Sequence, residues 1–234
     1  MLHAQAQVAS RRPIPALDRL PAAPTRGDEL SFLGSEATRL SFAPRETVCF
    51  EEDPADSIFF VRSGTVKTCK FLADGRRQVT GFLFAGDMFG LHTNGAYVYS
   101  VEAVTDAVVE VLPRRRLDAA FERDPALQRR FLTTLSNELV AAQEQLLLLG
   151  RRSAEEKLAW FLLMLADRYG VSAAGDVLHL PMRGTDIADY LGLTPETVSR
   201  TLSAFKRQGL VRAVAPWALQ LKDRDALEAI VHGD

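Results

Sequence analysis

The sequence has 234 residues, of which 47% are hydrophobic and 25% charged, a composition typical of globular chains and unlike that of disordered or collagen-like ones. It contains no run of about 18 apolar residues and no secretory signal pattern, so we expect a cytoplasmic protein without a membrane segment. The net charge of −2 does not by itself indicate a nucleic-acid partner.

The cysteines and histidines do not form a recognisable metal or disulfide pattern. Cys49 and Cys69 are the two cysteines, and they lie in strand-like sequence. Their number and spacing suit neither a disulfide framework nor a zinc site. The four histidines are scattered, so we predict no metal. No combination of nucleophile, base and orienting group and no Walker loop is visible, which argues against an enzyme.

The N-terminal half divides into two parts. Residues 1–27 are rich in Ala, Pro and Arg without clear periodicity, and we expect them to be mobile. From about Phe42 to Pro113, short runs of β-branched and aromatic residues alternate with turn signals such as Asp74-Gly75 and Gly86-Asp87. This pattern predicts an antiparallel β-sandwich or β-roll, to which we assign residues 28–115.

A leucine stripe follows, between Asp124 and Gly150, and it predicts a long helix within residues 116–150. Its 3.5-residue period is that of a seam between two helices, which predicts a homodimer. The alternative is one amphipathic helix lying on its own sheet. Additional apolar residues, such as Phe131, widen the stripe, so one helix could do both. The predicted interface residues are Leu132, Leu135, Leu139, Ala142, Leu146 and Leu149.

Residues 151–234 are predicted to form a second domain. It opens with Ser153 and Glu156, a capping-box signature before a predicted helix over Ala154–Arg168. The other elements expected around its central motif are a short strand over Val177–Pro181, a hairpin or wing over Val211–Lys222 that turns at Ala215-Pro216, and a helix over Arg224–Val231.

The central motif runs from Thr185 to Arg200. Thr185 is predicted to cap a helix that extends through Leu191, and Gly192 supplies a turn. Thr194 and Pro195 then cap and start a second helix that ends before Gly209. Small and apolar residues stand where the two helices would approach each other. The spacing therefore predicts a helix-turn-helix.

The second helix carries a polar cluster near its N-terminus, separate from the face of Val198, Leu202 and Phe205. An Arg can pair with guanine, and a carboxylate one turn away can accept from cytosine. The alternative is a surface ion pair between Glu196 and Arg200. The net charge of +2 between Arg183 and Arg212 supports DNA contact only weakly. We predict base contacts by Glu196, Ser199 and Arg200, and backbone contacts by Thr185, Thr194, Thr197, Ser203, Lys206 and Arg207.

These motifs, with the run Phe50–Gly64 and the turns at Asp74-Gly75 and Gly86–Gly90, resemble the CRP/FNR superfamily, most closely its FNR/FixK branch. The resemblance implies an α+β fold: an antiparallel β-roll like that of cyclic-nucleotide-binding domains, a long dimerisation helix and a C-terminal winged helix-turn-helix. It also implies a transcription activator that binds TTGA-type inverted repeats and contacts RNA polymerase. Pro195 stands where the CRP branch carries another Arg.

Departures from the family decide the expected cofactor. The FNR branch holds an iron-sulfur cluster with four cysteines, and this chain has two. Leu91 replaces the Glu with which the CRP branch binds cyclic AMP, and Tyr97-Val98 replaces its Arg-Ser pair. We therefore expect a FixK-like regulator without a cofactor.

Two alternatives to a cofactor-free regulator remain at the level of the sequence. One is a regulator gated by an effector in the β-roll or by redox chemistry at Cys49 or Cys69. Another is an enzyme subunit with a regulatory β-roll, against which the C-terminal motif argues. The hairpin from Asp74 to Arg77 could touch RNA polymerase or be a plain solvated turn.

Overall fold

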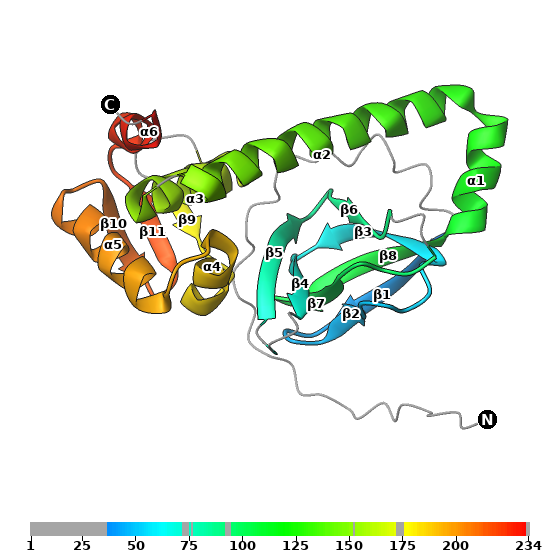
Figure 1. Cartoon of the computed structure of the whole chain (residues 1–234), viewed down its shortest axis with the longest axis horizontal. Helices are drawn as coiled ribbons and strands as arrows, with labels where there is room; N and C mark the ends of the chain where they lie inside the picture. Colours follow the sequence, from blue (N-terminus) through cyan, green and yellow to red (C-terminus); the bar gives the residue numbers. More distant parts are fainter. Residues whose placement is uncertain are drawn as a thin grey trace.

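The N-terminal domain is a β-roll of two antiparallel four-stranded sheets (Figure 1). The computed structural model describes residues 37–71, 75, 77–91, 95–151, 153–171 and 176–232, so the segment 1–27 and Asp74 lie outside it. One sheet has the order β1 (Thr38–Phe42), β8 (Ala107–Pro113), β3 (Ser57–Ser63) and β6 (Met88–Phe89); the other has the order β2 (Thr47–Cys49), β7 (Ser100–Ala103), β4 (Thr65–Phe71) and β5 (Arg77–Phe84).

Aromatic side chains fill the space between the two sheets. The rings of Phe59 and Phe89 stack with centroids 4.7 Å apart, and Tyr97 lies 5.7 Å from Phe59. The Tyr97 hydroxyl donates to the Ser57 carbonyl at 3.0 Å. At the predicted turn, Gly90 has φ +80°, and a Cβ there would lie 3.0 Å from the ring of Phe59. This position therefore requires glycine for its space as well as its dihedral angle.

Two helices follow the β-roll. Helix α1 (Arg114–Arg123), which the sequence analysis did not separate from the long helix, buries only Leu117. Asp124 ends it and starts α2 (Pro125–Arg151), because its Oδ1 accepts from the backbone N–H of Ala126 at 2.9 Å. In Figure 1, α2 runs from the far side of the β-roll towards the C-terminal domain.

Helix α2 divides its apolar residues between two surfaces. Leu127 and Phe131 are buried against the β-roll, with half-buried Leu135 beside them. Leu132 and Leu139 are 57% and 61% exposed, and Ala142 is also exposed. The side chains of the remaining predicted seam residues, Leu146 and Leu149, lie outside the described part. The helix thus packs on its own domain and leaves a second apolar stripe exposed.

The C-terminal domain combines helices with a small antiparallel sheet in the order β10-β11-β9. The predicted capping box is present, with the Glu156 N–H donating to Ser153 Oγ at 3.2 Å and the Ser153 N–H to Glu156 Oε2 at 2.6 Å. The elements are α3 (Ala154–Arg168), β9 (Val177–His179), α4 (Gly184–Leu191), α5 (Pro195–Arg207), β10 (Val211–Ala215), β11 (Ala218–Leu221) and α6 (Arg224–His232).

The predicted wing is the hairpin of β10 and β11. Its turn lies at Pro216-Trp217, one residue later than expected, and Trp217 has φ +63°. None of the helices in the described residues is long and apolar enough to cross a membrane.

One apolar core extends across both domains. Phe82 of β5 packs 6.1 Å from Phe161 of α3 and 5.2 Å from Tyr190 of α4, measured between ring centroids. Phe84, at the end of β5, meets Tyr169 edge-on at 5.5 Å. These contacts bring β5 next to α4 and hold the C-terminal domain against the β-roll (Figure 1).

Candidate DNA-binding surface

Helices α4 and α5 form the predicted helix-turn-helix. Gly192 ends α4 with φ +62°, a left-handed conformation that suits glycine, and the Leu193 N–H donates to the Ala188 carbonyl at 2.9 Å. Ala188 is completely buried, which allows the two helices to approach each other. The prediction for Thr185 as a cap is wrong: α4 begins at Gly184, and Arg183 stands at the cap position without a side-chain hydrogen bond.

The start of α5 agrees with the prediction. Thr194 Oγ1 accepts from the Thr197 N–H at 3.2 Å, and Pro195 occupies the first turn, where its missing N–H costs nothing. The helix ends at Arg207, and Gly209 follows with φ +78°. Local capping residues thus set both ends of this helix.

Helix α5 has one buried face and one exposed face. Val198 and Phe205 are buried as expected, Leu202 is half-buried, and Thr201 is an additional buried residue. No ion pair joins Glu196 to Arg200 in the structure, although both are described, so the alternative of a mutual surface pair is not observed. The predicted base-contacting residues Glu196, Ser199 and Arg200 are all exposed.

The six residues predicted to contact the DNA backbone differ in their exposure and in their position on the domain. Lys206 and Arg207 are exposed at the end of α5, as is Ser203, whose hydroxyl donates to the Ser199 carbonyl at 2.8 Å. Thr194 is exposed and Thr197 half-buried, with their hydroxyls 3.0 Å apart. Thr185 is exposed but lines a cavity between the two domains.

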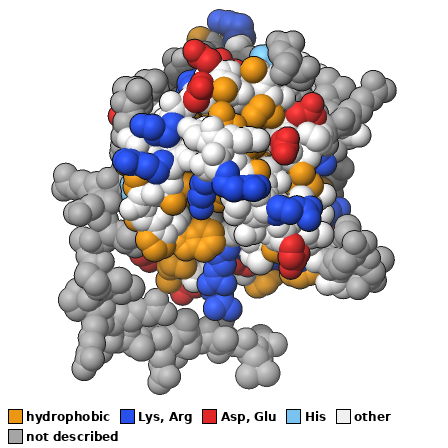
Figure 2. Space-filling view, turned by 90° about the vertical axis from the view of Figure 1, so that its left-hand side faces the viewer, with side chains coloured by type: hydrophobic (Ala, Val, Ile, Leu, Met, Phe, Trp, Pro, Cys, Tyr) orange, Lys and Arg blue, Asp and Glu red, His pale blue; other side chains and the backbone are white. Residues whose placement is uncertain are grey.

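The end of the molecule formed by the C-terminal domain carries a band of Lys and Arg side chains, with acidic side chains mostly above and below it (Figure 2). Asp186, which counted against positive charge in the sequence, does not weaken this surface. It is buried, and its Oδ1 lies 2.9 Å from Lys67 Nζ and 2.7 Å from Arg77 Nη2, both in the β-roll. The charge of Asp186 is therefore compensated inside the fold by two cations of the β-roll.

Polar contacts between the two domains fix the position of α4. Lys67 also pairs with Glu102 of β7 at 2.9 Å, and Gln78 Nε2 donates to the Asp189 carbonyl. Asp87 pairs with Arg168 of α3. The sequence analysis missed these residues because they are far apart in the chain. The one local signal is a Lys between Val66 and Cys69, at position 67 of a strand that is mostly buried.

Both cysteines are buried in the β-roll. Burial raises the pKa of Cys49 to about 12 and that of Cys69 to about 11. Both are therefore thiols at neutral pH and poor nucleophiles, because the thiolate is the reactive form. Within the described residues, no three His, Cys, Asp or Glu side chains are grouped so that they could hold a metal ion.

Comparison with known proteins identifies both domains. Residues 39–124 match the cyclic nucleotide-binding domain family, and residues 156–230 match the Crp-like helix-turn-helix domain family. The chain is 40% identical over 191 residues to the nitrogen fixation regulation protein FixK of Azorhizobium caulinodans, a match that covers 81% of this chain and 77% of that protein. FixK of Bradyrhizobium diazoefficiens is 39% identical over 193 residues, covering 82% and 81%.

A solved structure agrees with these sequence matches. The structure of FixK2 from Bradyrhizobium japonicum superposes with a TM-score of 0.77 at 36% identity, and the match covers 83% of this chain and 96% of that one. The predicted fold, a β-roll with helices and a C-terminal helix-turn-helix domain, is thereby confirmed. The chain belongs to the CRP/FNR family and is a FixK-like, DNA-binding transcription regulator.

Proposed function

We propose that this regulator is an activator that binds TTGA-type inverted repeats as a homodimer, through the exposed N-terminal face of α5. The observation that carries the proposal is the division of this helix into a face anchored by Val198 and Phe205 and a face on which Glu196, Ser199 and Arg200 are free. A recognition helix must present its N-terminal side chains in this way to enter a major groove.

Each side chain has a role that follows from its chemistry. The Arg200 guanidinium pairs with O6 and N7 of a guanine, and the Glu196 carboxylate accepts from N4 of the paired cytosine. Ser199 contacts a base edge. Six further residues contact phosphates and set the register: Thr185, Thr194, Thr197, Ser203, Lys206 and Arg207.

The exposed stripe of α2 supports the dimer. Leu132 and Leu139 present apolar surface that a second copy of α2 would cover, with a period that suits helix pairing. A two-fold axis along this seam sets the two recognition helices about 34 to 36 Å apart, one turn of DNA. Functionally we divide the chain into a β-roll at 28–115, a dimerisation region at 116–150 and a DNA-binding domain at 151–234. The DNA-bound dimer then recruits RNA polymerase.

The residues present support function without an iron-sulfur cluster or cyclic AMP. Two buried cysteines do not fit a four-cysteine cluster. Leu91 is partly buried against the β-roll and α2 cluster instead of offering a carboxylate, and buried Tyr97 offers a phosphate no cationic partner. High thiol pKa values also argue against redox gating at Cys49 or Cys69.

The replacement Arg200→Ala tests the proposal. It should weaken binding to a TTGA inverted repeat by about 1 to 3 kcal/mol and relax the preference at one base pair, with little change on random DNA. Arg115→Ala, which removes an exposed Arg from α1, is the matched control and should leave the affinity unchanged. Fluorescence anisotropy with single-base operator variants measures both effects. Equal losses on operator and random DNA would refute base reading by Arg200.

A further inference from the structure

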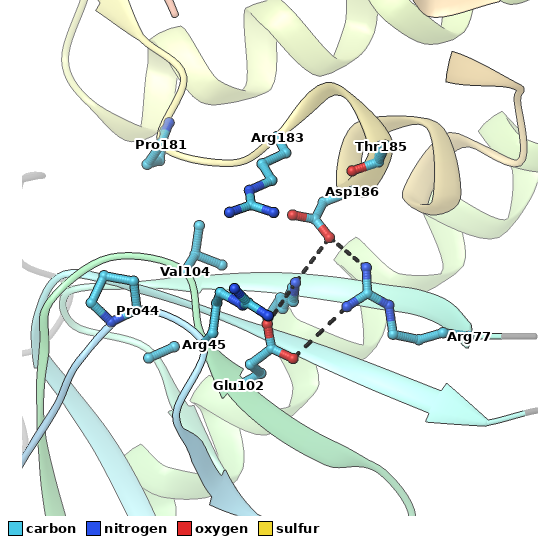
Figure 3. A pocket seen from close by; sticks show the side chains of 11 residues that line it. Pro44, Arg45, Arg77, Glu102, Val104, Pro181, Arg183, Thr185 and Asp186 are labelled. Atoms are coloured by element: carbon cyan, nitrogen blue, oxygen red, sulfur yellow. Dashed lines mark hydrogen bonds and ion pairs between the residues drawn. The ribbon is translucent and has the colours of Figure 1, made fainter. Parts of the chain in front are cut away.

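A cavity of about 270 Å³ lies between the β-roll and the start of α4 (Figure 3). The β-roll contributes Arg45, Lys67, Arg77 and Glu102 to its lining, and the C-terminal domain contributes residues that include Arg183 and Asp186. The site is separate from the aromatic core between the two sheets. It is slightly smaller than the usual small-molecule pocket of about 300 Å³ or more, so its occupant would be small.

The charges around this cavity do not balance. Its lining holds four cationic side chains and two carboxylates. Both carboxylates are already paired: Lys67 Nζ lies 2.9 Å from Glu102 and 2.9 Å from Asp186, and Arg77 lies 2.7 Å from Asp186. Neither Arg45 nor Arg183 has a carboxylate oxygen within ion-pair distance among the described residues. Two guanidinium charges are therefore left over.

The two unpaired guanidinium groups come from different domains and extend into the same space (Figure 3). Arg45 is held in a turn with φ +74°, where its N–H donates to the Ala103 carbonyl at 2.7 Å. Arg183 directly precedes α4, whose N-terminus adds partial positive charge on the same side. Like charges around one cavity repel each other across the domain boundary, and an anion between them would reverse this effect.

We propose that this cavity binds a small oxyanion of the phosphate class, which bridges Arg45 of the β-roll and Arg183 of the C-terminal domain. Guanidinium groups suit this ligand because their planar N–H donors match pairs of phosphate oxygens. Because the ligand contacts both domains, its binding stabilises the docked position of α4 and, with it, of the recognition helix.

Inorganic phosphate and the full-length protein test the proposal without DNA. At constant ionic strength, replacing chloride by phosphate should raise the melting temperature, and titration calorimetry should give a saturable site. Arg45→Gln and Arg183→Gln should each weaken this binding about tenfold or more, since each removes a charge-assisted pair. Both residues are exposed, so unchanged circular dichroism is expected. Arg115→Gln, far away on α1, is the control. Equal stabilisation of all variants would mean an adventitious ion only and would overturn the site.

The same oxyanion chemistry is available from a free anion or from the phosphate backbone of DNA. Operator duplexes with short and long flanks distinguish the two sources. If long duplexes abolish the binding of inorganic phosphate, and if Arg45→Gln weakens binding to long duplexes but not to short ones, the ligand is a phosphate of the DNA backbone. If inorganic phosphate still binds the protein in the presence of either duplex, the ligand is a free anion. The DNA-free titration is independent of the proposed operator, so the two proposals can fail separately.

Discussion

Removing the charge of Asp186 should destabilise the docked arrangement of the two domains. In Asp186→Asn, Lys67 keeps its charge although its side chain is only 6% exposed, and Arg77 loses its shortest partner. Breaking a buried pair from one side costs about 3 to 5 kcal/mol. We expect the lower end, about 3 kcal/mol, because Glu102 still lies 2.9 Å from Lys67 Nζ. For a chain of this size, that corresponds to a fall in melting temperature of about 6 to 12 °C.

Calorimetry with a double-mutant cycle measures the effect. Lys67→Met removes the other charge at similar length, so the double variant should recover part of the loss. Asp167→Asn is the matched control, because this carboxylate pairs with Arg224 at 2.6 Å but is 65% exposed. It should cost less than about 1 kcal/mol. A coupling energy near zero between Asp186 and Lys67, or equal losses for Asp186→Asn and Asp167→Asn, would refute the reasoning.

Three further predictions concern the dimer, the DNA backbone and the thiols. Leu139→Glu should give monomers in sedimentation and abolish operator binding. Thr133→Glu, at an exposed position elsewhere on α2, should leave the dimer intact. An unchanged mass for Leu139→Glu would refute the proposed dimer interface. Lys206→Ala should weaken binding to all DNA sequences alike. It should also reduce the slope of log affinity against log salt concentration by about 0.9 for each phosphate that Lys206 neutralises. An unchanged slope would contradict the pairing of Lys206 with a phosphate. Because burial raises the pKa of Cys49 and Cys69 to about 12 and about 11, unfolding releases protons above pH 9, so stability should fall from pH 9 to 11. Replacing both by Ala should flatten this decline, and an equally steep fall in that variant would assign it to other groups.

Elements with local signals could be predicted from the sequence. Thr194 and Pro195 at the start of α5 and Gly192 at the end of α4 act within a few residues of their own positions, and so does the capping box at Ser153. Alternating apolar residues predicted the β-roll in the same way. For the helix ends, neighbouring residues determine the backbone conformation, whereas the alternation predicted strands but not their pairing, such as that of β1 with β8.

Features that depend on distant residues could not be predicted. Asp186 and Lys67 are 119 positions apart, and nothing local distinguishes a buried interdomain carboxylate from a solvated acidic residue in the first turn of a helix. Thr185 had the chemistry of a cap, but α4 starts at Gly184, two residues before the start that a cap at Thr185 would give. Helix α1 could not be separated from α2, because a helix that buries only Leu117 has too few apolar residues to show a period.

The apolar core that Phe82 shares with Phe161 and Tyr190 makes the position of the helix-turn-helix depend on side-chain volume in the β-roll. Close-packed interiors transmit changes of shape, so a smaller or larger side chain on β5 would change the orientation of the helix-turn-helix without altering any residue that we propose to contact a base. The side chains of this strand are therefore a means of changing DNA affinity without touching the DNA-binding surface.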